Sequence, residues 1–499
     1  MNNETGKLSF DKLLLLSSVF ALFYTFCLYR NKMGLTFPLF ALGTAALFLY
    51  YLRLSGRALK RGSALYLAGI ALLGLNVCLT SNEIVILFDK GFIFLLFFML
   101  FLHNLYDVAT WDLSKYALSL SAMILSTVQF LPRPVKDLGA YLNIRTGERS
   151  KNRAPAETAG GQMKSVVFYV MVGLGISVPL LAVILPLLLS SDVIFMEFFE
   201  GVFDFDIGDD LGAILFMVVS VFVASYGMLC RFGQPMKYAA TPVTDKRTHS
   251  PVIAITVNLV LLVVYLAYCG IQVVYLFLRR GTLPEGYTYS SYAHEGFFQL
   301  VFVCMINILI VLICRKYSAD SAALKSVLCL ISACTYVLIA SAAYRMFLYI
   351  SAYKLTFLRL YVLWALAVMA VVMAGGIVYL FRPGMQFARF AAGVLMGLWI
   401  VFAYAKPDYL IAAYNIQNHD DDSYILQLSY DAVPAIEKYD ASGKLLADYF
   451  EFGSYSIFDE NLEGDAPRGR KASLRTWNYS QQRTYRIYDG YRERQRSSF

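Results

Sequence analysis

The chain has 499 residues, of which 58% are hydrophobic and 16% are charged, and its formal net charge is +8. Soluble domains carry about 25% charged residues, so this composition excludes an ordinary soluble protein and favours a membrane protein. The Lys and Arg residues are dispersed in loops without the aromatic motifs of nucleic-acid binding, so no nucleic-acid partner is predicted. The eight cysteines lie in or beside apolar runs without CxxC spacing, which indicates buried thiols rather than disulfides or zinc ligands.

Apolar runs of about 18 residues or more predict transmembrane helices, because no other open structure satisfies its backbone in lipid. In the N-terminal part, residues 1–110, we predict four spans, at about 13–29, 35–52, 63–80 and 84–106. The sequence SNEIVILFDKG, residues 81–91, is interpreted as a tight acidic linker between the last two.

Residues 111–164 differ from the spans around them. A polar stripe at helical spacing indicates an amphipathic helix over 112–131 that lies in the membrane interface; its members are Asp112, Lys115, Ser119, Ser126 and Gln129. If this helix crossed the membrane instead, the number of spans would rise by one. The basic loop 133–164 that follows is predicted to be cytoplasmic and could bind anionic lipid, although its charge could also serve only to set topology.

Residues 165–415 form the second membrane part. Seven spans are predicted there, at about 165–190, 211–230, 251–278, 297–314, 322–349, 357–381 and 387–405. The predicted fold class is therefore an all-α polytopic membrane bundle of about eleven transmembrane helices. The positive-inside rule then puts the N-terminus in the cytoplasm and the C-terminus outside it.

Residues 416–499 lose the long apolar runs and are predicted to form a small extracytoplasmic, α-rich domain or tail. Short helices are expected over 424–440 and 445–452, separated by a turn at 441–443, and a further helix from Leu474 to about Gly490.

The stretch from Leu283 to Leu300 holds the strongest candidate site. It places a carboxylate, an imidazole and three phenols before a span, and Arg345 with two further tyrosines is predicted at the outer end of another. A charge near the membrane is costly without a partner, so an outward pocket for an anionic or zwitterionic ligand is one hypothesis. A structural clasp between helix ends is the alternative. The candidate residues are Glu295, His294, Arg345, Tyr349, Tyr353, Tyr287, Tyr289 and Tyr292.

Other polar residues give weaker indications. Carboxylates in the outer loop could hold a hard cation, or they could form a plain solvated loop; they are Asp204, Asp206, Asp209 and Asp210. Six polar residues are scattered within spans: Asn76, His103, Asn104, Asn258, Gln272 and Asn307. His103 could relay protons, but a hydrogen bond between helices is the simpler interpretation. No cofactor is predicted.

Several blocks resemble a family of uncharacterised bacterial multi-pass membrane proteins called domain of unknown function 4173. The blocks are SSDVIF at 190–195, GYTYSSYAHEGFFQL at 286–300, YRMFLYISAYKLTFLRLYVLW at 344–364, AAYNI at 412–416, LSYDAVPAI at 428–436 and WNYS at 477–480. The resemblance covers about residues 165–490, and it would place a glycine where this chain has Lys354. It implies a bacterial inner-membrane location and no established activity.

The function predicted from these features is a non-enzymatic envelope sensor or accessory protein that binds a ligand or partner at its outer face. A transporter of small solutes or lipids and a membrane-embedded transferase acting on envelope lipids remain alternatives. The bilayer itself is the one partner that the composition requires.

Overall fold

The computed structural model describes residues 8–108, 111–141, 207–235, 247, 249–274, 297–382, 384–418, 423–453 and 474–497. Within these ranges the regular structure is helical, apart from a single isolated bridge between His249 and Ser318. All-α architecture is thus confirmed for this part of the chain.

Nine of the described helices are long and apolar enough to cross a membrane. They are α1 (Phe10–Leu28), α2 (Thr36–Leu54), α4 (Glu83–Leu105), α9 (Ile207–Phe232), α11 (Pro251–Gln272), α13 (Phe297–Tyr317), α14 (Ala322–Tyr353), α15 (Phe357–Phe381) and α16 (Phe387–Tyr404). The apolar helix α3 (Ser63–Leu79) is shorter, at 17 residues. The predicted span at 165–190 lies outside the described residues.

The helix α4 agrees with the predicted span at 84–106 to within one residue at each end. Asn82 caps it by accepting a hydrogen bond from the backbone N–H of Val85 at 2.9 Å, and the helix continues from Glu83 without a break. The interpretation of residues 81–91 as a linker is therefore wrong, because only the first two residues of that stretch precede the helix. Asp89, the acidic residue that suggested a loop, is fully buried inside the bundle.

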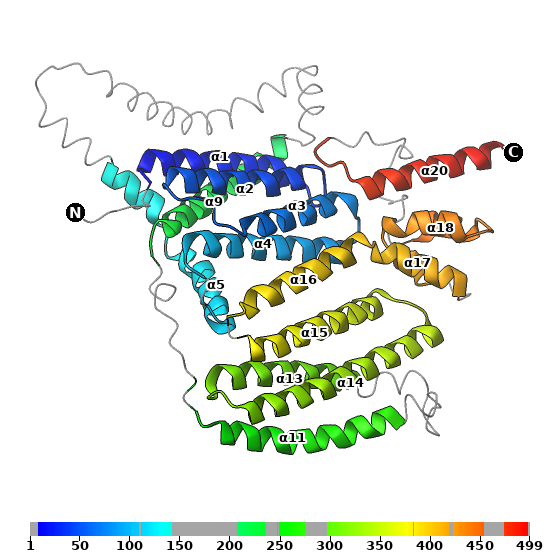
Figure 1. Cartoon of the computed structure of the whole chain (residues 1–499). Coiled ribbons are helices and arrows are strands. Elements are labelled where there is room, and N and C mark those ends of the chain that lie inside the picture. The colour runs from blue at the N-terminus through cyan, green and yellow to red at the C-terminus, as the bar shows by residue number, and fades with distance from the viewer. Residues whose placement is uncertain are drawn as a thin grey trace, which may run out of the picture.

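The helices stand side by side in a flattened bundle (Figure 1). From one edge to the other, α1, α2 and α9 are followed by α3 and α4, then α16, α15, α13 with α14, and α11. The largest cluster of buried apolar side chains joins α1 to α5 with α9 and α16. Two helices from late in the chain therefore complete the core that the N-terminal helices begin.

The helix α5 (Leu113–Val128) runs across the direction of its neighbours α4 and α16 (Figure 1). Two residues of its polar stripe, Lys115 and Ser119, are buried against the protein, whereas Leu118 and Leu125 are 53% and 68% exposed. The buried face also includes Tyr116 and Met123, whereas Ser114, Ser121 and Gln129 are exposed. An interfacial position for this helix stays a prediction.

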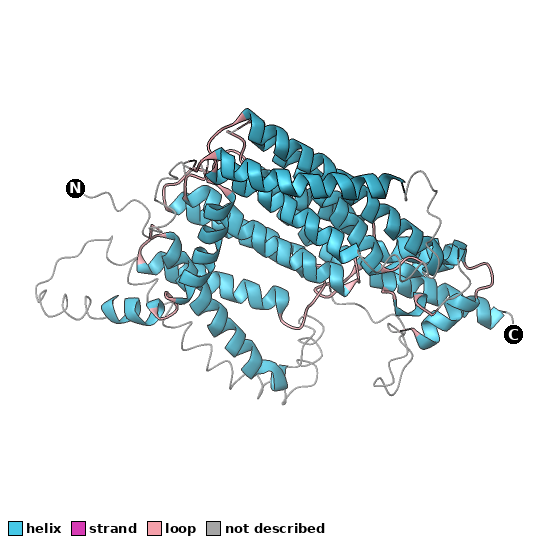
Figure 2. Cartoon of the chain, turned by 90° about the horizontal axis from the view of Figure 1, so that it is seen from below, coloured by secondary structure: helices cyan, strands magenta, loops and turns pink. Residues whose placement is uncertain are grey.

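The C-terminal elements gather beyond one end of the bundle, where Figure 2 shows shorter helices past the ends of the long ones. They are α17 (Pro407–Asn418), the 3₁₀ turns η2 (Ile425–Gln427) and η3 (Tyr430–Ala432), α18 (Val433–Tyr439), α19 (Lys444–Phe452) and α20 (Tyr479–Ser497). Gly443, with φ of +67°, provides the turn between α18 and α19 that the sequence predicted. We call these described elements the end cap.

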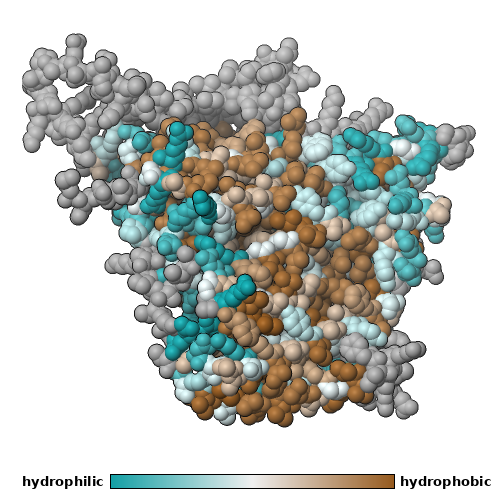
Figure 3. Space-filling model, in the orientation of Figure 1, coloured by the Kyte–Doolittle hydropathy of each residue, from teal (hydrophilic) through white to brown (hydrophobic). Residues whose placement is uncertain are grey.

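The surface agrees with a membrane location. Hydrophobic residues cover the middle of the face seen in Figure 3, and hydrophilic residues gather toward the two ends of the helices. Large apolar side chains on the peripheral helix α11 are widely exposed, with Val263 at 68%. An apolar band of this kind is stable only when lipid covers it.

Candidate functional site

Only part of the outer cluster predicted from the sequence is described by the structure. Tyr287, Tyr289, Tyr292, His294 and Glu295 lie outside the described residues, so a contact between Glu295 and Arg345 stays a prediction. Arg345 lies on α14 and is buried, with 8% exposure. Its guanidinium donates to Gln272 Oε1 on α11 at 3.3 Å, and Ser341 donates to the same oxygen at 2.8 Å. Gln272 is a partner of Arg345 that sequence reasoning missed.

Tyr349 and Tyr353 do come together at the end of α14. Their ring centres lie 5.3 Å apart, and the guanidinium carbon of Arg359 lies 3.9 Å from the centre of the Tyr349 ring. Arg359 also donates to the backbone carbonyl of Lys354. The cation and the ring therefore hold the turn between α14 and α15. The clasp and pocket hypotheses for the whole cluster both stay predictions.

Most of the proposed cation site in the outer loop lies outside the described residues. Asp204 and Asp206 lie outside the described residues, and of Asp209 and Asp210 only the backbone, in the first turn of α9, is described. Most of the basic loop, residues 142–164, is likewise outside the described part of the chain. Both hypotheses stay predictions.

The polar residues within the spans make hydrogen bonds between or along helices. Asn307 accepts from Tyr265 at 2.8 Å and donates to Thr335 at 2.9 Å. His103 lies 2.9 Å from the Arg61 carbonyl through Nε2 and 2.8 Å from an Arg389 N–H group through Nδ1. A carbonyl on one side and a guanidinium donor on the other fix the neutral Nε2–H tautomer, which favours a structural bond over a relay.

Asp89 is a buried carboxylate within the membrane bundle that was not predicted as a candidate site residue. Its two oxygens accept from Asn76 Nδ2 and from Trp399 Nε1, each at 2.7 Å. Trp399 is itself fully buried against Phe88 and Phe92. Because Trp399 lies 310 residues further along the chain, no local pattern could have revealed this contact.

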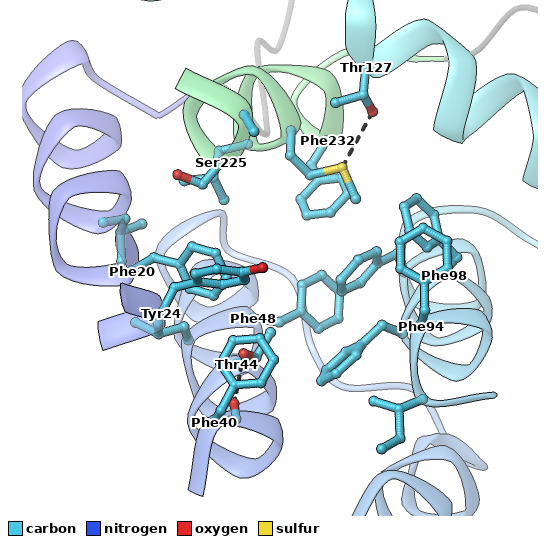
Figure 4. A pocket seen from close by; sticks show the side chains of 18 of the residues that line it. Phe20, Tyr24, Phe40, Thr44, Phe48, Phe94, Phe98, Thr127, Ser225 and Phe232 are labelled. Carbon is cyan, nitrogen blue, oxygen red and sulfur yellow. Dashed lines mark hydrogen bonds between the residues drawn. The ribbon is translucent and has the colours of Figure 1, made fainter. Parts of the chain in front are cut away.

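A cavity with a volume of about 510 Å³ lies between α1, α2, α4, α5 and α9. In Figure 4, Phe20 and Tyr24 project into it from α1, Phe40 and Phe48 from α2, and Phe94 from α4. Phe232 of α9 closes another side. We call this cavity the aromatic pocket.

The wall of the aromatic pocket is more apolar than its residue types suggest. Thr44 donates to the carbonyl of Phe40, Thr127 to that of Met123 and Ser225 to that of Phe222, each within its own helix. These hydroxyls therefore have partners within the protein, and Thr127 Oγ1 also lies 3.4 Å from Met228 Sδ of α9 (Figure 4). Phe94, which is 53% exposed, marks a side on which the pocket meets the surface of the apolar band.

A single charged side chain stands among the described residues that line the pocket. Lys90 donates from Nζ to the backbone carbonyl of Lys32 at 2.5 Å, and Nζ lies 5.2 Å from the centre of the Phe37 ring. A lysine within the apolar sequence of α4 was the signal that could have indicated this site, but residues 81–91 were interpreted as a linker.

A buried polar network ties the end cap to the bundle. Asp431 accepts from the Thr80 hydroxyl and from Lys406 Nζ, the latter at 3.1 Å. Asp408 accepts from Asn82 Nδ2 at 2.8 Å and from the Ser429 hydroxyl at 2.6 Å. Burial raises the pKa of Asp408, and these hydrogen bonds oppose that rise.

Residues of the C-terminal sequence blocks take part in the same attachment. Asn478 donates to the carbonyls of Thr80 at 2.9 Å and Met33 at 3.1 Å, and the hydroxyls of Ser480 and Ser81 lie 3.1 Å apart. Asn415 exchanges two hydrogen bonds with the backbone of Leu355, at 2.8 and 2.9 Å. The blocks AAYNI, LSYDAVPAI and WNYS thus supply buried contacts between the end cap and the loops.

Comparison with known proteins gives one match. The model of a family described as "Domain of unknown function (DUF4153)" matches residues 67–439, about three quarters of the chain. The expected membership of an uncharacterised family is confirmed, but the family is 4153 and not 4173. The match also begins earlier than residue 165 and ends before the WNYS block. No curated protein and no solved structure matches the chain.

Proposed function

This chain belongs to the DUF4153 family, and we propose that it is a non-enzymatic envelope protein that holds an apolar chain from the bilayer in its aromatic pocket. The observation that carries the proposal is the pocket itself. Its volume of about 510 Å³ falls within the range of small-molecule sites, and its wall is formed largely by aromatic rings. A cavity of this size lined by apolar groups gains contact energy when a hydrocarbon fills it.

The position of the pocket supports a ligand that comes from the membrane. It lies among helices whose length and composition suit a bilayer, and Phe94 at its margin is exposed in the apolar band. A chain could therefore move sideways from lipid into the pocket without crossing water. A role as a sensor or accessory protein would follow if filling the pocket changed how α1, α2, α4 and α9 pack together.

Transport is supported less well by the described residues. A polar path from Glu295 toward Asn307 was the condition for a transporter, yet Asn307 is fully buried and bonded to Tyr265 and Thr335. The transferase alternative depends on the acidic outer loop and stays a prediction.

We place the protein in a bacterial inner membrane with its N-terminus in the cytoplasm. The basic residues between α2 and α3, at the end opposite the end cap, support that orientation. On this orientation the end cap and the Lys90 end of the pocket are extracytoplasmic, which agrees with ligand binding toward the outer face. Binding of anionic lipid by the basic loop 133–164 is a separate proposal.

The proposal can be tested by photocrosslinking in liposomes that contain a lipid with a photoactivatable acyl chain. We expect labelled peptides from the pocket faces of α2 and α4, and we expect Thr44→Trp to reduce this labelling about tenfold because the indole would fill the cavity. Leu259→Trp on the exposed face of α11 is the matched control and should leave the labelling unchanged. Equal labelling of α2 and α4 in the wild type and in Thr44→Trp would contradict the proposal.

A further inference from the structure

The aromatic pocket has different chemistry at its two ends. At one end Lys90 and Phe37 lie beside the connection between α1 and α2, and at the other Phe48, Phe101 and Phe232 close the cavity. The rings of Phe48 and Phe101 have centres 4.6 Å apart, and those of Phe101 and Phe232 are 4.7 Å apart. One end is therefore cationic and the other is a closed aromatic floor.

The length of the pocket matches a single acyl chain. From Lys90 to Phe101 the helix α4 rises by about 16 Å, and from Phe37 to Phe48 the helix α2 rises by the same amount. The hydrocarbon core of a bilayer is about 30 Å thick, so one leaflet contributes about half of that. A chain with its polar end at Lys90 would thus reach the aromatic floor.

The ammonium of Lys90 is placed to receive an anion. The carbonyl of Lys32 accepts one of its N–H groups, and an ammonium has three donors. The Phe37 ring lies 5.2 Å from Nζ and adds a cation–π contact. The group is half-buried, and a charge at this depth gains more from an opposite charge than it would in water.

We propose that the ligand of the aromatic pocket is an anionic membrane lipid whose phosphate or carboxylate binds Lys90 while one acyl chain lies along α2 and α4. This proposal rests on the proposed function and adds the identity of the headgroup. The competing account is that Lys90 only extends its ammonium toward the membrane surface and does not discriminate between headgroups.

The test compares two probes of equal chain length, hexadecyl phosphate and hexadecanol, as competitors of the photoactivatable lipid on the full chain in neutral liposomes. We expect the phosphate to compete about tenfold or more better than the alcohol, since a hydrogen bond to a charged group contributes about 1.5–3 kcal/mol. Lys90→Met should remove this difference by weakening only the phosphate. Lys90→Arg should restore much of it, and Lys444→Met, at an exposed position of the end cap, should change nothing.

The outcomes separate the two proposals. If both probes compete equally in the wild type, or if Lys90→Met leaves the preference intact, headgroup recognition by Lys90 is overturned while chain binding stands. If neither probe competes, chain binding in the pocket is overturned as well. Should Lys90→Met fail to fold, the preference of the wild-type protein between the two probes still decides the headgroup proposal.

Discussion

Lys354 has a backbone conformation that favours glycine over residues with a Cβ. It ends α14 with φ of +86° and ψ of 162°, a region that glycine occupies far more easily than residues with a Cβ. Its backbone N–H donates to Ile350, and its carbonyl accepts from Arg359, so the surrounding contacts hold the conformation in place. The family resemblance placed a glycine at this position, and the backbone explains why.

We therefore expect Lys354→Gly to raise the free energy of unfolding by about 1 kcal/mol, which is the relief of strain less the entropic cost of glycine. The shift in the midpoint of thermal unfolding in detergent measures it. Lys354→Ala keeps the Cβ and serves as the control, since it should give no such gain. A glycine variant no more stable than the alanine variant would show that the turn is not strained.

At the scale of elements, the end cap connects helix ends that are far apart in the sequence. It bonds to the start of α4 through Asp408. The segment that leads into α20 bonds to the loop before α2, since the backbone carbonyl of Arg475 accepts from Asn31 at 3.1 Å. Asn415 fixes the turn before α15. Gly34 permits the close approach of the chain at Arg475, because a Cβ there would lie only 2.6 Å from the Thr476 Cα.

Asn478→Ala should loosen the end cap, because the fully buried amide bonds to loops from two different helix pairs. Each buried backbone carbonyl left without a donor costs about 1–3 kcal/mol. We expect a lower unfolding midpoint and faster limited proteolysis after α19. Arg483→Ala, at an exposed position of α20, should match the wild type; equal protease resistance of both variants would mean that Asn478 does not secure the cap.

The positions of the helices could be predicted from the sequence more accurately than the side on which each helix meets the rest of the protein. Long apolar runs identified ten described helices because lipid imposes length and composition on each span separately. The burial of Lys115 and Ser119 against the protein was not predicted, since periodicity shows that two faces of α5 differ but not which one meets protein. Residues 81–91 were wrongly interpreted as a linker because Asp89 and Lys90 suggested water, whereas the partners of these two residues lie on α3, on α16 and in the loop before α2.

At the scale of the whole molecule, the aromatic pocket arises only from the way helices assemble. Its lining comes from five helices, and α9 joins α1 even though more than 170 residues separate them. None of the lining segments carries a motif that predicts a cavity, because each reads as an ordinary apolar span. The polar clusters in the sequence led us to predict a site in the outer loops, whereas the cavity lies between helices and many phenylalanine side chains line it.

The most direct test is a density map of the full chain in lipid nanodiscs containing anionic lipid. We expect elongated density between α2 and α4 that begins beside Lys90 Nζ and ends near Phe101. A pocket filled by this chain's own residues, such as the predicted span at 165–190, would contradict lipid binding there. So would a pocket closed by its own aromatic side chains.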